Sequence, residues 1–249
     1  MGKSLRAVLR GFGGRRKRAL DPYLATRGLV DSAAPVIFDV GANVGATAQR
    51  YRALYPRAAI HCFEPYPPSF EALSEALSAD SLVSLHRLAL SSARGSGVLN
   101  VNRNAETNSL LPSDAHAARY WGKGLLETQS KVEVALQTLD EFCEEHSVAR
   151  IDVLKLDVQG AEYSVLEGAD ALLTARRIGM IYAEVIIAPT YVGQRRLVDY
   201  LSLLSAKGYE LFDLYNPTRR DGRLIQSDII FVSAEVLERY ERSKAERAD

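Results

Sequence analysis

The chain has 249 residues, is 47% hydrophobic and carries 31 basic and 31 acidic residues, so its formal net charge is zero. This length suits one α/β domain with an insertion better than two domains. A neutral chain has no overall positive field to hold a polyanion, which argues against nucleic-acid binding. Its two cysteines, Cys62 and Cys143, form no C-x-x-C pair, which argues against a disulfide framework and a structural zinc and predicts a cytoplasmic protein.

The first twenty residues are basic and contain no acid, and Leu5, Val8, Leu9 and Phe12 could form one apolar face of a short helix there. No long apolar region follows, so we do not expect a secretory signal. A solvated leader is one interpretation, and contact with an anionic membrane surface or partner is the other. Elsewhere the apolar runs are shorter than the about 20 residues of a membrane span, so no transmembrane helix is expected.

Apolar runs rich in β-branched residues alternate with segments of helical period, which is typical of βαβ units around a parallel sheet. Two strands joined without a helix must pair antiparallel, so the last strand should be reversed, after a turn at 216–222. Seven strands are predicted, at 36–40, 59–63, 83–88, 151–156, 180–185, 209–214 and 228–232. Helices are predicted up to Leu54, around Phe70–Leu77, and over 138–145, 162–173 and 195–206.

The alternation breaks between residues 91 and 131, where extra strands at 98–101 and 132–136 bracket a long loop. A loop of this length inside a compact domain is usually functional or disordered. We therefore predict a basic leader or cap over 1–35, an α/β domain over 36–233 with an insertion at 91–137, and a helical tail over 234–249.

A glycine loop, Gly41-Ala42-Asn43-Val44-Gly45, follows the first strand, where the ligand crevice of a doubly wound sheet lies. Its glycines allow a tight turn and leave room for a ligand. Asn43 breaks the G-x-G-x-x-G fingerprint of dinucleotide binding, and the G-K-[ST] of a phosphate loop is missing. The loop therefore suits a nucleoside without phosphates, such as S-adenosylmethionine (SAM); a tight turn without a ligand is the alternative.

Two acids flank this loop. Glu64 ends the second strand 19 residues after Gly45, where a carboxylate can accept hydrogen bonds from both ribose hydroxyls. Asp39 can accept from the ammonium of the ligand or organise the loop, although an acid at a strand end is often only a cap. The predicted cofactor contacts are Asp39, Gly41, Ala42, Asn43, Gly45, Glu64, Pro65, Ala89, Leu90 and Asp157.

These segments together resemble the FkbM family of SAM-dependent methyltransferases, over about Val36 to Val232. The resemblance implies a Rossmann-like class I methyltransferase fold and methyl transfer to a hydroxyl oxygen of a small molecule, such as a sugar, glycoside or polyketide-type natural product. Gln159 stands where family members frequently carry Glu, and we leave it out of the predicted catalytic set. The matching residues are Val36–Gly45, Phe63-Glu64-Pro65, Leu139-Asp140, Ile151–Glu162 and Ala183-Glu184.

An alcohol is a poor nucleophile near neutral pH, so a base or a metal should remove its proton. Asp157, at the end of the fourth long strand, is the first candidate, with Lys155 on the same face of that strand. Glu184, an acid within an apolar strand, and His116 in the insertion complete the predicted catalytic set. Asp157 could instead only order the methionine part of SAM, and Lys155 with Asp157 could be a structural ion pair. No ligand spacing predicts a metal, although a divalent ion at Asp157 and another carboxylate is an alternative.

Four further expectations concern one glutamate, three histidines, the insertion and three arginines. Glu162 opens a helix, where capping is its simplest role. Three histidines, His61, His86 and His146, are interpreted as structural. The insertion is expected to determine acceptor specificity, with a lid that makes no contact as the alternative. Its relevant residues are Asn104, Asn108, Ser109, Arg119, Tyr120 and Trp121, whereas Arg219, Arg220 and Arg223 are expected to be solvated.

Two other classes of function compete with a methyltransferase. A nicotinamide-nucleotide-dependent dehydrogenase is disfavoured by the missing glycine and the reversed strand, and a module that binds SAM without turnover is the second alternative. The sequence does not predict the oligomeric state.

Overall fold

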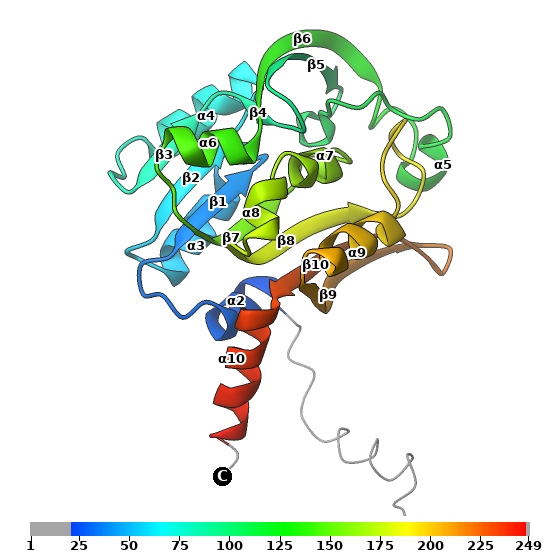
Figure 1. Cartoon of the computed structure of the whole chain (residues 1–249). Helices are drawn as coiled ribbons and strands as arrows, with labels where there is room; N and C mark the ends of the chain where they lie inside the picture. Colours follow the sequence, from blue (N-terminus) through cyan, green and yellow to red (C-terminus); the bar gives the residue numbers. More distant parts are fainter. Residues whose placement is uncertain (1–20, 248–249) are drawn as a thin grey trace, which may run out of the picture.

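A seven-stranded sheet with helices on both faces forms the centre of the molecule (Figure 1). The computed structural model describes residues 21–247, and the strand order is β3-β2-β1-β7-β8-β10-β9. Strands β3, β2, β1, β7 and β8 run parallel, whereas β10 pairs antiparallel with both of its neighbours. The predicted fold class, a mostly parallel sheet with a reversed last strand, is confirmed.

The strands of this sheet are β1 (Val36–Val40), β2 (Ala59–Phe63), β3 (Val83–His86), β7 (Ile151–Leu156), β8 (Ile178–Ile186), β9 (Tyr209–Arg220) and β10 (Arg223–Ser233). One face is covered by α2 (Pro22–Leu29), α3 (Ala46–Leu54), α4 (Pro67–Leu77) and α10 (Ala234–Ala245). The other face is covered by α6 (Leu139–Glu145), α7 (Glu162–Glu167), α8 (Asp170–Thr174) and α9 (Leu197–Ala206).

Strand β1 shows why the central segments are almost continuously apolar. Its alternate residues point to opposite faces of the sheet. Phe38 and Val40 pack in the cluster beneath α6 to α9, while Ile37 packs in the cluster beneath α2, α3 and α4. Burying one such side chain contributes about 1.5–3 kcal/mol, so a strand covered on both faces needs apolar residues at consecutive positions.

Two predicted elements differ from the structure. The helix expected over 162–173 is divided at Gly168 and Ala169 into α7 and α8. The turn expected at 216–222 is wrong, because β9 continues to Arg220 and β10 begins at Arg223. The polar residues of this stretch belong to the exposed ends of the two paired strands. Exposed strand residues can be as polar as those of a turn, which is the reason that a turn was predicted here.

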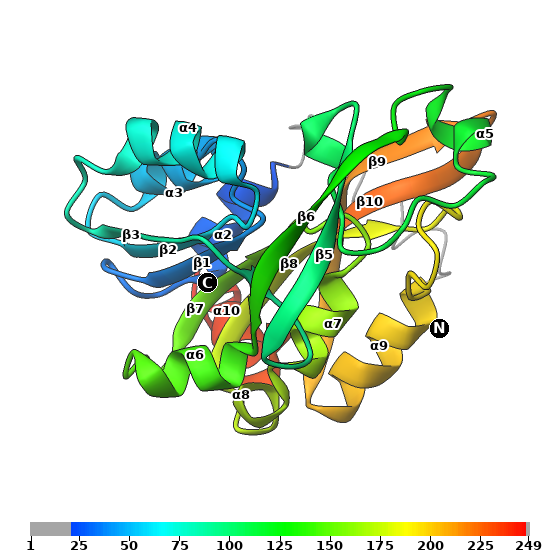
Figure 2. The same ribbon diagram turned by 90° about the horizontal axis from the view of Figure 1, so that it is seen from above.

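The insertion forms a separate small sheet, at the top of the view in Figure 1 and seen from above in Figure 2. The strand expected over 83–88 ends at His86, because the chain leaves the main sheet there and enters the small one. The small sheet has the order β4-β6-β5 and carries a short 3-10 helix and a short α-helix between β5 and β6. Its elements are β4 (Ala89–Leu90), β5 (Gly95–Asn102), η1 (Ala105–Thr107), α5 (Ala118–Trp121) and β6 (Thr128–Gln137).

Helices α2 and α10 pack together on the face that also carries α3 (Figure 1). Tyr23 and Leu29 of α2 are buried in the core, and the guanidinium of Arg239 in α10 donates to the Leu29 carbonyl. The boundary predicted at residue 35 stays a prediction, and the apolar residues noted at 5–12 lie outside the described residues. Between residues 21 and 247, no helix combines the length and the apolar character needed to cross a bilayer.

Three histidines gather on the sheet face covered by α6. His61 Nδ1 lies 3.2 Å from His86 Nε2, and the ring of His146 lies 5.7 Å from that of His86. Burial, together with the charges of the neighbouring imidazoles, lowers the pKa of His61 and of His86 to about 4. Their place inside the fold agrees with the structural interpretation.

This cluster predicts a pH dependence of stability. Because both pKa values are lower in the folded protein, the unfolded chain binds more protons between pH 6.5 and about 4, so their contribution to stability is lost as the pH falls through that window. The melting temperature should therefore fall less steeply over pH 6.5 to 4 in a His61→Asn, His86→Asn double variant than in the wild type. Parallel curves for the two proteins would contradict this prediction.

Candidate active site

The glycine loop turns directly after β1 and is held by β2. Gly41 N and Ala42 N both donate to the Phe63 carbonyl at 3.0 Å. Gly41 and Gly45 have φ values of 84° and 91°. A Cβ at Gly41 would lie 2.0 Å from the Asp157 carbonyl oxygen, and one at Gly45 would lie 2.9 Å from Leu77 Cδ1. The space that these glycines leave is therefore filled by the protein itself, which differs from the expectation that it is reserved for a ligand.

Glu64 connects the end of β2 to this loop. Its carboxylate accepts from Asn43 N at 2.9 Å and from Tyr66 N at 2.8 Å, and the residue is 7% exposed. Burial raises the pKa of Glu64, and the two amide donors oppose that shift. A carboxylate has about four acceptor positions, so Glu64 can accept further hydrogen bonds from a ligand.

One cavity of ≈ 470 Å³ runs from the glycine loop and Glu64 to the ends of β7 and β8. The small sheet and the segment before α9 close it with Thr107, Trp121 and Tyr191. Nine of the predicted site residues line it: Gly41, Ala42, Asn43, Glu64, Pro65, Ala89, Leu90, Asp157 and Glu184. Four others do not line it: Asp39, Gly45, Lys155 and His116.

Asp39 lies in β1 beside Lys155 of β7 and is completely buried. Neither carboxylate oxygen has a hydrogen-bond partner within residues 21–247. Burial raises the pKa of Asp39 to about 7, against the opposing charge of Lys155. His116, by contrast, is exposed near α5. The structure thus places both residues away from the cavity surface.

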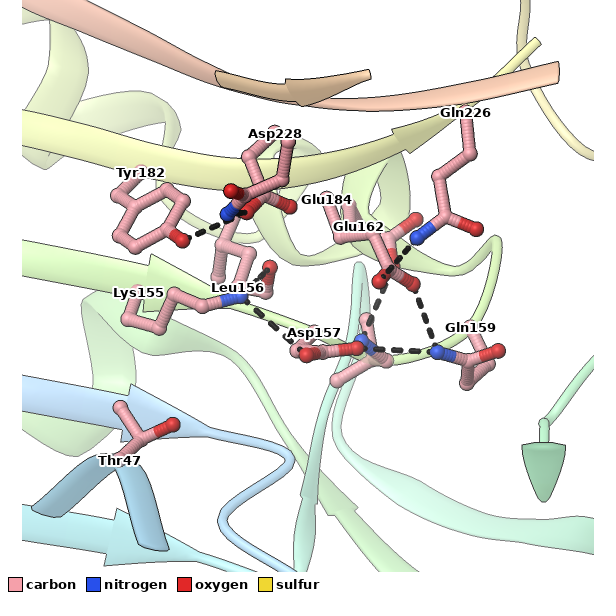
Figure 3. Close-up of polar contacts among 12 residues, drawn as sticks. Thr47, Lys155, Leu156, Asp157, Gln159, Glu162, Tyr182, Glu184, Gln226 and Asp228 are labelled. Carbon is pink, nitrogen blue, oxygen red and sulfur yellow. Dashed lines mark hydrogen bonds and ion pairs between the residues drawn. The ribbon is translucent and has the colours of Figure 1, made fainter. Parts of the chain in front are cut away.

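Lys155 is the cation at the end of β7 (Figure 3). Its side chain is 4% exposed, and its Nζ lies 3.4 Å from Asp157 Oδ2, 3.1 Å from the Leu156 carbonyl and 4.6 Å from the centre of the Tyr182 ring. Burial disfavours the ammonium, but the charges of Asp157 and Glu184 raise the pKa of Lys155 above its ordinary value. Lys155 therefore stays charged and neutralises carboxylates that face the cavity.

Glu184 points from β8 toward Asp157 and is held by two amides. Gln159 Nε2 donates to its Oε2 at 2.7 Å, and Gln226 Nε2 donates to its Oε1. Burial raises the pKa of Glu184 well above its usual range, and the charge of Asp157 raises it further. Lys155 opposes this shift. Glu184 therefore takes up a proton more readily than an ordinary glutamate does.

Glu162 opens α7 as expected, but it makes no side-chain capping hydrogen bond to the helix and instead binds the loop before it. Its Oε1 accepts from Val158 N at 2.9 Å and from Gly160 N at 3.2 Å, at the start of α7. Burial raises the pKa of Glu162 to about 7. Within the described residues, no group of three or more His, Cys, Asp or Glu side chains is arranged to hold a metal ion.

Four residues that line the cavity were not predicted as site residues from the sequence: Gln159, Tyr191, Thr190 and Gln226. Trp121 Nε1 donates to Thr190 Oγ1 at 2.7 Å, which ties α5 to the segment after β8. The departure from the family pattern at Gln159 was the one available signal. The other three residues lie in an irregular loop or on the reversed strand, where no motif marks them.

The insertion contributes four of its predicted residues to the cavity: Asn104, Asn108, Ser109 and Trp121. Arg119 and Tyr120 do not line it. The arginines at the end of the β9–β10 hairpin were expected to be solvated, and two of them, although exposed, bind Tyr120 instead. Arg220 Nη1 donates to its carbonyl at 3.2 Å and Arg223 Nη1 to its hydroxyl at 3.0 Å.

A doubly wound sheet with a reversed strand β10, a crevice where β1 and β7 meet, and an acid at the end of β2 are together typical of the Rossmann-like methyltransferases. The family model described as the methyltransferase FkbM domain matches residues 39–211, and the chain belongs to this family. It is therefore a methyltransferase, which decides against the nicotinamide-dependent alternative.

The curated relatives are methyltransferases of bacteria and fungi. The chain is 31% identical over 184 residues to the 2-O-methyltransferase NoeI of Sinorhizobium fredii, covering 71% of this chain and 73% of that protein. It is 35% identical over 157 residues to methyltransferase sdnD of Sordaria araneosa, covering 55% and 61%. The crystal structure of methyltransferase FkbM from Methylobacillus flagellatus shares the fold, with a TM-score of 0.51 at 13% identity over 80% of this chain and 44% of that one.

The packing around Gly41 predicts the effect of adding one methyl group. Gly41→Ala should destabilise the protein by about 1–3 kcal/mol more than Gly222→Ala, because both add a Cβ at positive φ but only the first meets backbone. Chemical denaturation of the two variants measures the difference. Equal losses of stability would show that the Asp157 carbonyl does not restrict this position.

Proposed function

We propose that this protein is a SAM-dependent O-methyltransferase that methylates a hydroxyl group of a small molecule. The observation that carries this proposal is the single cavity that joins Glu64 and the glycine loop to the carboxylates Asp157 and Glu184. One end of it offers acceptors for a nucleoside, and the other offers a base beside a space for a second molecule.

The cofactor end fits a nucleoside without phosphates. Glu64 would accept the ribose hydroxyls, while Gly41 to Asn43 and Pro65 would contact the cofactor through their backbone and Ala89 and Leu90 would line it with apolar surface. The cavity-lining stretches 40–47 and 63–69 contain no lysine or arginine to bind phosphates. When bound, SAM supplies an electrophilic methyl group on its sulfonium.

At the other end, Glu184 would accept the proton of the acceptor hydroxyl. A general base works best when its pKa lies near the working pH, and the environment of Glu184 moves it in that direction. Asp157, the first candidate from the sequence, is less suited because the ammonium of Lys155 faces its Oδ2. Asp157 would instead orient the acceptor beside Glu184.

The acceptor class is a sugar, glycoside or polyketide-type compound. Its end of the cavity combines the indole of Trp121 with polar groups of Asn108, Thr190 and Gln226, a combination that suits an alcohol with several oxygen atoms. The relative NoeI is named a 2-O-methyltransferase. Incubation with labelled SAM and a panel of such compounds tests the proposal and separates turnover from SAM binding without chemistry.

The ribose assignment predicts the effect of Glu64 variants. Glu64→Ala should weaken binding of S-adenosylhomocysteine by about 1.5–3 kcal/mol, because charge-assisted hydrogen bonds are lost, and Glu64→Gln should cost less. Glu75→Ala removes an exposed carboxylate from α4 and serves as the matched control. Unchanged affinity in Glu64→Ala, measured by calorimetry, would refute this contact.

The choice of base predicts a split between turnover and binding. Glu184→Gln should lower kcat by about 10²–10⁴-fold with little change in affinity for S-adenosylhomocysteine, and Asp157→Asn should lower kcat less. Melting temperatures show whether each variant is folded. A larger loss in Asp157→Asn than in Glu184→Gln would return the role of the base to Asp157.

A further inference from the structure

We propose that Gln159 is a positioning residue whose side-chain amide takes the place of the proton or cation that two adjacent carboxylates otherwise require, and so keeps Glu184 able to act as a base. This inference rests on the proposed function and names a residue to which no role had been assigned. Dashed lines in Figure 3 join the side-chain amide of Gln159 to Asp157 and to Glu184.

The hydrogen bonds of the amide nitrogen are the first line of support. Gln159 Nε2 lies 3.0 Å from Asp157 Oδ1 and 2.7 Å from Glu184 Oε2. An amide nitrogen carries two hydrogen atoms, so each carboxylate receives one. Hydrogen bonds donated to a carboxylate favour its ionised form, which opposes the effects of burial and of charge repulsion on Glu184.

The anchoring of Gln159 is the second line of support. Its φ is 54°, a left-handed conformation that a residue with a long side chain seldom adopts without a reason. Ser109 Oγ donates to its backbone carbonyl at 2.7 Å. The Tyr191 hydroxyl lies 3.1 Å from its Oε1 and 3.0 Å from the Thr107 carbonyl. The amide nitrogen is thus aimed at the carboxylates from a fixed position.

A glutamate at position 159 would have the opposite effect. It would keep the shape of the side chain but replace the donor with a third carboxylate, so Asp157, Glu184 and the new group would repel one another. Such a cluster needs a shared proton or a divalent cation. The charged and titratable groups that face Glu184 are Lys155 on β7, Asp157 directly after β7, Glu162 on α7, Asp228 on β10 and Tyr191 before α9.

The test compares Gln159→Met, which removes the donor at similar size, with Gln159→Glu. Both substitutions should move the acidic limb of the plot of kcat against pH to higher pH, by about 1–2 pH units, and activity should be recovered at alkaline pH. Gln159→Glu alone should also gain a rise in melting temperature on addition of Mg²⁺ or Mn²⁺. Gln129→Met and Gln129→Glu change an exposed glutamine outside the cavity and should move neither readout.

A second measurement separates this inference from the proposed function. Carboxyl ¹³C signals of labelled glutamate, with Glu184 assigned through Glu184→Gln, report its titration without turnover. If the wild type transfers no methyl group but the Glu184 signal still titrates higher in Gln159→Met, the proposed function fails and the role of Gln159 stands. The inference is overturned if neither Gln159 variant moves the titration, or if the wild type responds to the cations as Gln159→Glu does.

Discussion

The buried ammonium of Lys155 is the constraint on which the site depends. Strands β7 and β8 run parallel, so the carboxylates of Asp157 and Glu184 are brought to the same edge of the sheet. A carboxylate that leaves water must recover its lost solvation from a cation or from hydrogen-bond donors. Lys155, 3% exposed, supplies the charge, and the same carboxylates keep it protonated. Removing the ammonium of Lys155 would leave the carboxylates without a compensating charge, and removing the carboxylates would leave the ammonium without one. The three charged groups therefore depend on one another.

The sequence predicts the sheet well wherever a strand is buried on both faces. Such a strand leaves a continuous apolar run, and β1 and β2 were predicted with the bounds observed. The β9–β10 hairpin was not predicted in full, because residues 216–220 are exposed and their polar composition also suits a turn. The two strands are extended by pairing between their backbones, such as that of Thr218 with Gln226. Backbone pairing does not require particular side chains, so the amino-acid composition does not reveal it.

The candidate site was predictable as far as it follows from topology. An acid at the end of a parallel strand must lie at the crevice, which is the reason that Glu64 and Asp157 could be named in advance and that both line the cavity. Asp39 pairs with Cys62 and Lys155, two residues before the positions level with Glu64 and Asp157, and is therefore buried within the sheet instead of lying at its edge. Gln159 and Tyr191 are 32 residues apart and meet through a left-handed backbone and a loop, which no spacing rule describes.

In the proposed function, the hydrogen bonds between the insertion and the main sheet would join acceptor recognition to the chemistry. Ser109 donates to the backbone of Gln159, the Tyr191 hydroxyl lies within hydrogen-bond distance of both Gln159 Oε1 and the Thr107 carbonyl, and Trp121 donates to Thr190. A lid that only covered the cavity would need none of these contacts. Because Gln159 in turn donates to both carboxylates, a displacement of the insertion would be transmitted to Glu184, the proposed base. The proposed acceptor wall and the proposed base therefore belong to one hydrogen-bonded unit, and a change of acceptor specificity would have to preserve the position of Gln159.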